Sequence, residues 1–96
     1  MFALVRTKAF ERDVRHYLAK GGSAKRLEDA LGHLCKEATL SPWLRDHPLH
    51  GKLRGCRELH VEPDWLLVYE KDGKRLRIVC LWLVTHQKLR ERERGM

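Results

Sequence analysis

Residues 65–84 read WLLVYEKDGKRLRIVCLWLV, two apolar runs separated by a short charged segment. Runs of this length, rich in branched and aromatic residues, are typical of β-strands, so we predict strands over 65–70 and 75–84. Gly73 accepts the positive φ that a type I′ turn requires, which predicts a two-residue hairpin turn within 71–74. The stretch therefore indicates an antiparallel strand pair.

The second of these strands is apolar on both faces, because side chains alternate along a strand. A strand of this kind is usually central in its sheet. The two sets of apolar side chains are Leu76, Ile78, Cys80 and Trp82 on one face, and Val79, Leu81 and Leu83 on the other.

Upstream of this pair, the apolar pattern predicts a third strand over Leu53–Val61, joined to Trp65 by a turn at 62–64. A short apolar strand is also predicted at 2–5, near the start of the chain. Because the strand at 75–84 is apolar on both faces, we expect it to lie inside the sheet, with another strand on each side.

Two helices are predicted between the strand at 2–5 and the strand at 53–61, because apolar residues there recur at helical spacing. Gly21 and Gly22 end the first helix, and Ser23 can cap the second. The apolar stripes are Phe10, Val14, Tyr17 and Leu18 in the first helix, and Leu27, Ala30, Leu31, Leu34, Cys35 and Ala38 in the second.

The element order is therefore β-α-α-β-β-β, which predicts an α+β fold. We expect a mostly antiparallel twisted sheet with a helical hairpin packed on one face, and the other face open. A chain of 96 residues builds one modest core, so residues 1–96 are predicted to form a single domain. Residues 90–96 read as a charged, flexible tail or a solvated helical end.

The charge of the chain indicates an anionic partner. Lys and Arg number 20 against 13 Asp and Glu, a formal net charge of +7, and nucleic acid is the first candidate. The three cysteines are widely spaced, which is not typical of a disulfide framework, and Cys35 and Cys80 lie in apolar patterns. Because the sequence has neither a signal-peptide pattern nor a run long enough to span a membrane, we expect a cytoplasmic protein.

Four of the six histidines lie outside the predicted helices, where functional residues concentrate: His47, His50, His60 and His86. One interpretation is a zinc site, because His47 and His50 have HxxH spacing. The proline between them and the absence of cysteines at ligand spacing weaken it. His16 and His33 lie off the apolar stripes of their helices and are interpreted as solvated surface residues.

The other interpretation is proton transfer to and from RNA, which needs no metal. Cleavage by the neighbouring 2′-hydroxyl requires a base, an acid for the departing 5′-oxygen, and cations around the phosphate. Histidines with a pKa near 6.5 can supply both the base and the acid at cellular pH. His60 and Asp64 flank a turn and can project to the same sheet edge, where Asp64 can orient a histidine.

Residues 46–69 read DHPLHGKLRGCRELHVEPDWLLVY, and Thr-His follows the last predicted strand. The pattern D-H-x-L-x-G, then R-x-x-H-x-x-x-D-W-x-L-x-Y, resembles the YafQ-type branch of the RelE/ParE toxin superfamily. At the C-terminus the chain departs from the resemblance, because Arg90 stands where the family often has an aromatic residue after the position of Leu89. The matching residues are Asp46, His47, Leu49, Gly51, Arg57, His60, Asp64, Trp65, Leu67, Tyr69, Thr85 and His86.

The resemblance implies a RelE-like fold and a toxin of a type II toxin–antitoxin system. It implies a ribosome-dependent endoribonuclease that cleaves mRNA in the A site, beside 16S rRNA, without a metal or other cofactor. The implied partner, besides mRNA on the ribosome, is an acidic antitoxin protein. His47, His60, Asp64 and His86 are the implied catalytic residues, with His86 as the acid, His47 or Asp64 as the base, and His60 assisting.

Basic residues near His60 are candidates for binding RNA: Lys52, Arg54 and Arg57. Alternation along a strand would place Lys52 and Arg54 on one face and Arg57 on the other. Trp65 can stack on a base or pack in the core, and we favour packing because a Trp that begins a strand is usually buried.

Two alternative functions remain open at this point, because one scaffold can host several functions. The same superfamily includes gyrase-inhibiting toxins of the ParE type, which act by binding and need no acid–base cluster. The other alternative is a ribonuclease that acts on free RNA, independently of ribosomes.

Overall fold

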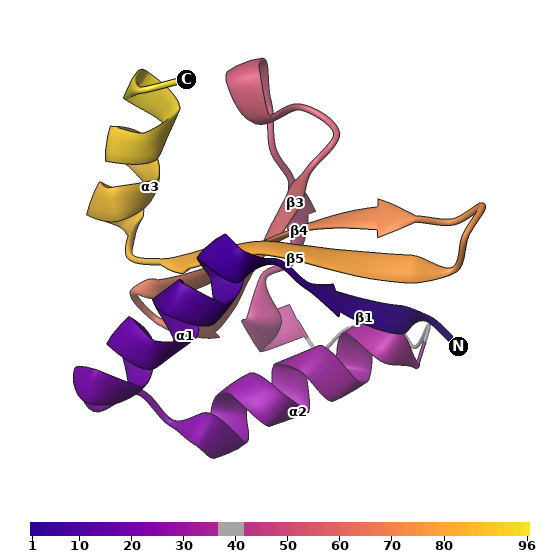
Figure 1. Ribbon diagram of the computed structural model, residues 1–96, viewed down its shortest axis with the longest axis horizontal. Helices are drawn as coiled ribbons and strands as arrows, with labels where there is room; N and C mark the ends of the chain where they lie inside the picture. Colours follow the sequence, from indigo (N-terminus) through magenta and orange to yellow (C-terminus); the bar gives the residue numbers. More distant parts are fainter. Residues whose placement is uncertain (37–41) are drawn as a thin grey trace.

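The computed structural model describes residues 1–36 and 42–96, and these residues form a five-stranded sheet with helices on both faces (Figure 1). The strand order is β1-β5-β4-β3-β2; β1 runs parallel to β5, and the other neighbours are antiparallel. The predicted α+β fold with a mostly antiparallel sheet is confirmed. The strands are β1 Ala3–Arg6, β2 His47–Pro48, β3 Arg57–Glu62, β4 Trp65–Asp72 and β5 Arg77–Val84.

The predicted helices are α1, Lys8–Ala19, and α2, Ala24–Cys35, which lie on the same side of the sheet (Figure 1). Ser23 caps α2 as expected, since its hydroxyl accepts a hydrogen bond from the Arg26 amide at 3.1 Å. Gly22 is required between the helices, because a Cβ there would lie 2.3 Å from the Tyr17 ring.

The predicted stripe of α2 is buried where it is described, at Leu27, Ala30, Leu31 and Leu34, whereas Ala38 lies outside the described residues. In α1, Phe10 and Tyr17 are buried as predicted, but Leu18 is 43% exposed. Asp13 of the same helix is buried, although it is not part of the apolar stripe. The periodicity of apolar residues alone could not reveal this exchange, because the burial of Asp13 depends on partners distant in sequence.

The predicted face alternation of β5 is correct only up to Cys80. Tyr69 pairs with Cys80 and Val68 with Trp82, so the register shifts between them and Leu81 is the extra residue. Such a bulge moves every later side chain to the opposite face. Consequently Leu83 joins Ile78 and Cys80 in the core under α1 and α2, whereas Trp82 lies on the other face.

The hairpin turn also differs from the prediction. It covers four residues, 73–76, and the positive φ (52°) falls at Leu76 and not at Gly73. The Asp72 carboxylate accepts a hydrogen bond from the Arg75 amide at 3.1 Å and pairs with Arg77. The turn is therefore organised by a side chain that bonds to nearby backbone, and not by glycine.

The strand predicted over 53–61 begins later than expected. Residues Gly51–Leu53 form a 3-10 turn, and both Gly51 and Gly55 have a positive φ, which breaks the extended conformation. β3 therefore begins at Arg57, and the predicted alternation of Lys52 and Arg54 along a strand is wrong.

The charged C-terminal segment is helical as far as Arg94, so the structure shows a helical end and not a flexible tail at 90–94. Helix α3, His86–Arg94, is capped by the Thr85 hydroxyl and lies on the sheet face opposite α1 and α2 (Figure 1). This face was expected to be open, but Leu89 of α3 and Leu53 pack there against Leu66, Val68 and Val84. Within the described ranges no helix is long and apolar enough to cross a membrane.

Candidate active site

His86 and Asp64 form the best-defined contact among the predicted site residues. Asp64 Oδ1 accepts hydrogen bonds from His86 Nδ1 at 2.6 Å and from the His86 amide at 3.2 Å. These bonds lower the pKa of the Asp64 carboxyl below its ordinary value. Because Nδ1 is held by a carboxylate, Nε2 is the ring nitrogen left to exchange protons.

His60 lies beside this pair, near the end of β3. Its ring centre is 5.5 Å from that of His86. Burial is the largest cause that lowers the pKa of His60, and the positive charge of Arg45 adds to it. Its Nδ1 atom is buried with no hydrogen-bond partner among the described residues. The ring is therefore kept neutral near pH 7 and can accept a proton.

His47 is positioned by the short strand β2, in which it pairs with Glu58 of β3. Its Nε2 lies 3.3 Å from a carboxylate oxygen of Glu58, and its Nδ1 lies 3.1 Å from the Pro48 carbonyl oxygen. Both ring nitrogens thus face acceptor oxygens. Glu58 and His60 are two residues apart on β3 and share a face, so His47 is brought to the same side of the sheet as His60.

A partly buried polar cluster holds β2 in place. Arg57 donates to the Asp46 carboxylate through Nε and Nη2, at 3.2 and 2.9 Å from Oδ2, and the Tyr69 hydroxyl also donates to Asp46. Burial and the Asp46 carboxylate raise the pKa of Tyr69. Because Asp46 immediately precedes His47, this cluster fixes the position from which the histidine projects.

The four residues proposed to bind RNA have different surroundings. Arg57 is engaged by Asp46, Arg54 is exposed, and the Lys52 ammonium donates to the carbonyl oxygens of Glu93 and Met96 at the end of α3. Trp65 packs edge-on against Tyr17, with ring centres 5.0 Å apart. Trp65 therefore has the packing contact that we favoured, and contact of all four with RNA stays a prediction.

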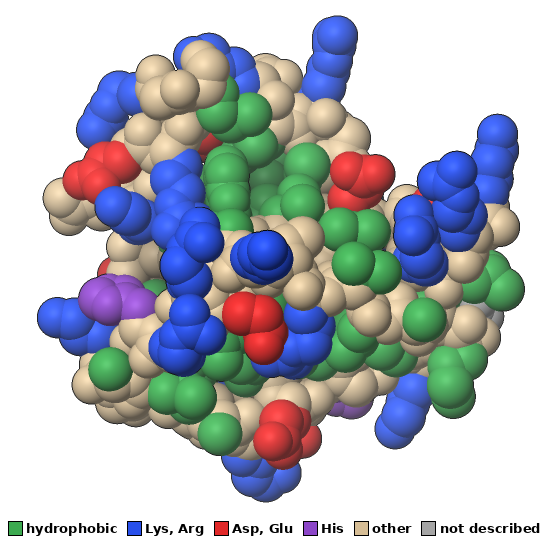
Figure 2. Space-filling model, in the orientation of Figure 1, with side chains coloured by type: hydrophobic (Ala, Val, Ile, Leu, Met, Phe, Trp, Pro, Cys, Tyr) green, Lys and Arg blue, Asp and Glu red, His purple; other side chains and the backbone are tan. Residues whose placement is uncertain are grey.

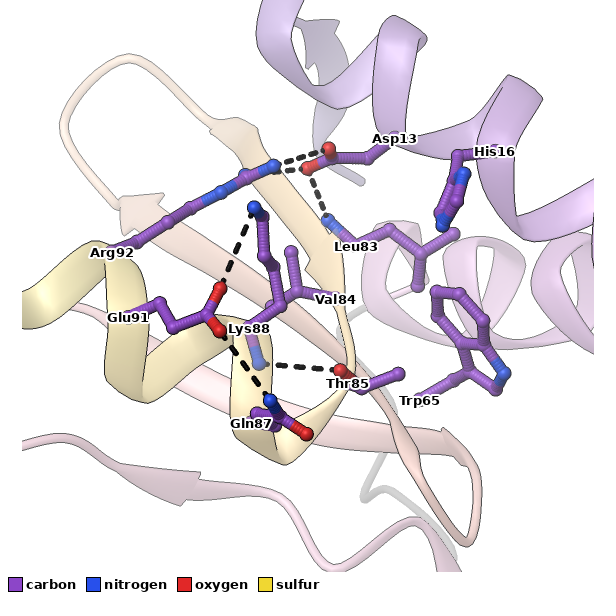
Figure 3. Close-up of a pocket in the computed structure, with 10 residues that line it drawn as sticks. All are labelled: Asp13, His16, Trp65, Leu83, Val84, Thr85, Gln87, Lys88, Glu91 and Arg92. Carbon is purple, nitrogen blue, oxygen red and sulfur yellow. Dashed lines mark hydrogen bonds and ion pairs between the residues drawn. The ribbon is translucent and has the colours of Figure 1, made fainter.

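Helix α3, which begins at His86, is anchored at its other end. Arg92 donates to both oxygens of Asp13, at 2.7 and 2.8 Å, and Asp13 also accepts from the Leu83 amide at 3.0 Å (Figure 3). Beside this pair lies a cavity of about 410 Å³ between α1 and α3, onto which Trp65 also faces (Figure 3). The ion pair thus ties α3 to α1 and β5.

Positive side chains are prominent on the face of the molecule drawn in Figure 2. Figure 2 shows Lys and Arg side chains spread over the visible face, around apolar side chains, with few acidic ones between them. This distribution suits a phosphate backbone. Within the described parts of the chain, no group of three or more His, Cys, Asp and Glu side chains is arranged to hold a metal ion.

The structure thus brings His60, Asp64 and His86 together and places His47 on the same face of the sheet. Sequence reasoning missed Glu58, the partner of His47, and Asp13, the partner of Arg92. A signal existed for Glu58, which lies two residues before His60 on a strand. None existed for Asp13, because its partner lies 79 residues away along the chain.

Comparison with known proteins gives consistent similarities. A metal-bound toxin from Helicobacter pylori is 34% identical with a TM-score of 0.86, over 93% of this chain and 99% of that one. YafQ in the Escherichia coli DinJ–YafQ toxin–antitoxin complex is 29% identical with a TM-score of 0.78, over 92% of this chain and 96% of that one. The mRNA interferase toxin YafQ of E. coli K12 is 54% identical over 33 residues, so this chain matches 36% of that relative's length.

The sequence model of the family described as "Bacterial toxin of type II toxin-antitoxin system, YafQ" matches residues 2–91. This match covers nearly the whole chain, and it includes every residue of the motif at 46–69 and the pair at 85–86. It confirms the resemblance to the YafQ branch. The chain therefore belongs to the YafQ family of type II toxin–antitoxin toxins.

Proposed function

We propose that this protein is an endoribonuclease that cleaves mRNA on the ribosome by metal-independent acid–base chemistry. The observation that carries the proposal is the placement of His60 beside His86, 5.5 Å between ring centres, with His86 held by Asp64. A neutral ring and a carboxylate-bound ring at this separation are suited to flank one phosphate. The curated relatives are named mRNA interferases, which agrees with mRNA as the substrate.

In the proposed reaction His60 accepts the proton of the 2′-hydroxyl, and the 2′-oxygen attacks the adjacent phosphorus. The bond from phosphorus to the 5′-oxygen breaks, and the leaving oxygen takes a proton from Nε2 of protonated His86. The products are a 2′,3′-cyclic phosphate and a 5′-hydroxyl. This assigns the base to His60, because its lowered pKa favours the neutral form, and gives Asp64 an orienting role.

The charge that builds on the phosphate oxygens needs positive groups close by. His47, whose ring nitrogens face the Glu58 carboxylate and the Pro48 carbonyl oxygen, is one candidate for this role, and Arg45 near His60 is another. His47 remains the rival candidate for the base. A pH–rate profile separates the two: loss of the acidic limb in His60→Gln, but not in His47→Gln, supports His60.

The experiment for the whole proposal is cleavage in a translating extract. Purified protein is added to a defined mRNA with and without ribosomes, and the new 5′ ends are mapped. We expect cuts within the reading frame only when ribosomes translate the message. Equal cutting of free RNA would favour a ribosome-independent nuclease, and no cutting by a toxic protein would favour a binding toxin of the ParE type.

We also propose that an acidic antitoxin protein binds this chain. The E. coli relative was solved in a complex with DinJ, and the net charge of +7 suits an acidic partner. Co-expression with the acidic product of a neighbouring reading frame should relieve toxicity and yield a stable complex. A product that neither binds nor protects would contradict this part of the proposal.

A further inference from the structure

A hollow of about 770 Å³ lies between α2 and the outer edge of β3. β2 pairs with β3 only at Arg57 and Glu58, so among the described residues the second half of β3 has no outer strand. His60 lines one wall of this hollow, and Trp43 lines another. The volume lies within the range of small-molecule sites and is large enough for a nucleotide.

Trp43 is the most exposed tryptophan of the chain. Its side chain is 80% exposed, whereas Trp65 and Trp82 are both partly buried. Its neighbour Leu44 is buried in the core, so the 3-10 turn Pro42–Leu44 is anchored while Trp43 is presented outward. The Trp43 ring is not packed in the core, and it borders the hollow. Its flat face is therefore available for another flat ring to stack on.

Two arginines line the hollow, Arg26 and Arg45, together with His33 and His60. Arg45 is exposed, and none of the described acidic side chains forms an ion pair with it. Its backbone has a positive φ of 53°, a costly conformation for a residue other than glycine that is found more often at functional sites.

The two acidic residues of the hollow, Asp29 and Glu62, have partners other than Arg45. Asp29 is paired with Lys25 at 3.2 Å. Glu62 accepts hydrogen bonds from the Tyr17 hydroxyl at 2.5 Å and from the Ser23 amide at 3.1 Å. Glu62 also lies 4.0 Å from Arg26. Neither carboxylate is paired with Arg45, so the Arg45 guanidinium can meet an anion from outside.

We propose that Trp43 stacks on a base of the substrate RNA, and that Arg45 binds a phosphate of the same strand. The nucleotide concerned lies next to the one that is cleaved, because His60 belongs both to the hollow and to the candidate active site. This inference rests on the proposed function for its substrate. RNA is favoured over a protein partner because an exposed aromatic ring beside an arginine with no ion-pair partner among the described residues matches a base and its phosphate.

The first test measures binding without cleavage. A short single-stranded RNA with 2′-O-methyl riboses cannot be cut and is titrated against each variant at low salt. Removal of an aromatic side chain that stacks on a base raises the Kd about tenfold. We expect that rise for Trp43→Ala and a change of less than about threefold for Trp43→Phe, which keeps a flat ring.

Leu76→Ala is the matched control. Leu76 is also an exposed apolar residue, 49% exposed, but it lies in the β4–β5 turn and does not line the hollow. Its replacement should leave the Kd unchanged. Intrinsic fluorescence adds a second readout, since a base stacked on Trp43 quenches emission in the wild type and not in Trp43→Phe.

The decisive test removes the base from the RNA instead of the ring from the protein. Abasic sites are placed one at a time along the RNA. We expect one abasic site to weaken binding of the wild type about tenfold and to have no further effect in Trp43→Ala, because the two changes remove the same contact. Additive losses at every position would overturn the proposal.

Two other results would also overturn it: no measurable binding of RNA by the wild type, or weaker binding of the antitoxin by Trp43→Ala with unchanged binding of RNA. The second would mean that a protein occupies the hollow. Failure of the stacking proposal is distinguishable from failure of the proposed nuclease function. Ribosome-dependent cleavage that is unchanged in Trp43→Ala leaves the nuclease standing and removes only the stacking site.

Discussion

Arg92 of α3 and Asp13 of α1 form a two-point ion pair, with N–O distances of 2.8 and 2.7 Å, although 79 positions separate them in the chain. The Asp13 side chain is 9% exposed and that of Arg92 is 26% exposed. This pair holds α3, and therefore His86 at its first turn, against the rest of the molecule. The position of one proposed catalytic group thus depends on a contact made near the opposite end of its helix.

Arg92→Ala should destabilise the protein by about 2–3 kcal/mol, because it leaves the buried Asp13 carboxylate without its charged partner. Urea unfolding measures this change. Arg94→Ala is the matched control, since Arg94 is exposed at the end of the same helix, and its replacement should cost less than about 0.5 kcal/mol. Equal effects of the two variants would show that the ion pair contributes nothing.

His86→Gln should keep its fold and its antitoxin binding, yet lose at least about 100-fold in single-turnover cleavage, because glutamine cannot transfer a proton. Asp64→Asn should also lose rate, since a neutral amide is a weaker acceptor for His86 Nδ1 and orients the ring less firmly. His50→Ala serves as the control, because His50 is exposed and lies outside the candidate site. Cleavage by His86→Gln near the wild-type rate would remove the acid from the mechanism.

Acidification should destabilise the wild type more than His60→Gln. The pKa of His60 is lowered in the folded protein, mainly by burial, so the unfolded chain binds the proton more readily. The stability contributed by neutral His60 is complete above about pH 6.5 and is lost as the pH falls towards the lowered value. Unfolding free energies at several values between pH 7.5 and pH 5 should fall less in the variant. Parallel curves would contradict this account.

The Asp46 cluster should respond unequally to two substitutions. Tyr69→Phe removes one hydrogen bond and leaves Asp46 paired with Arg57, so we expect a loss of about 1–2 kcal/mol. Asp46→Ala leaves both the Tyr69 hydroxyl and the Arg57 guanidinium without their acceptor, and should cost about 3 kcal/mol. It should also slow cleavage, because His47 loses its fixed neighbour. A larger loss of stability for Tyr69→Phe would reverse this interpretation.

Cleavage should continue when a zinc-selective chelator is in excess and Mg²⁺ is kept for the ribosomes, and it should leave a 2′,3′-cyclic phosphate and a 5′-hydroxyl. In the proposed mechanism His60 and His86 act through ring nitrogens that exchange protons, and a bound metal would occupy them. The ends are identified by their requirement for phosphatase or kinase treatment before ligation. Activity that is lost on chelation and restored by zinc would replace this mechanism with the metal-site interpretation of the HxxH pair.

The order and type of most elements were predictable from sequence, because the signals involved are local. Apolar periodicity placed both helices, Ser23 marked the start of α2, and the motif at 46–69 identified the family. The motif also named the residues that form the candidate site, since the spacing from His60 to Asp64 spans one tight turn. Local rules suffice wherever a feature depends on residues a few positions apart.

The remaining features were decided by contacts between distant residues. The bulge at Leu81 depends on pairing with β4, and it reverses the faces of Trp82 and Leu83. The burial of Asp13 depends on Arg92, and the neutral state of His60 depends on its burial and on Arg45. Which residue carries charge, and on which face it stands, is settled by desolvation and pairing in the folded chain, and these exist only once the elements have packed.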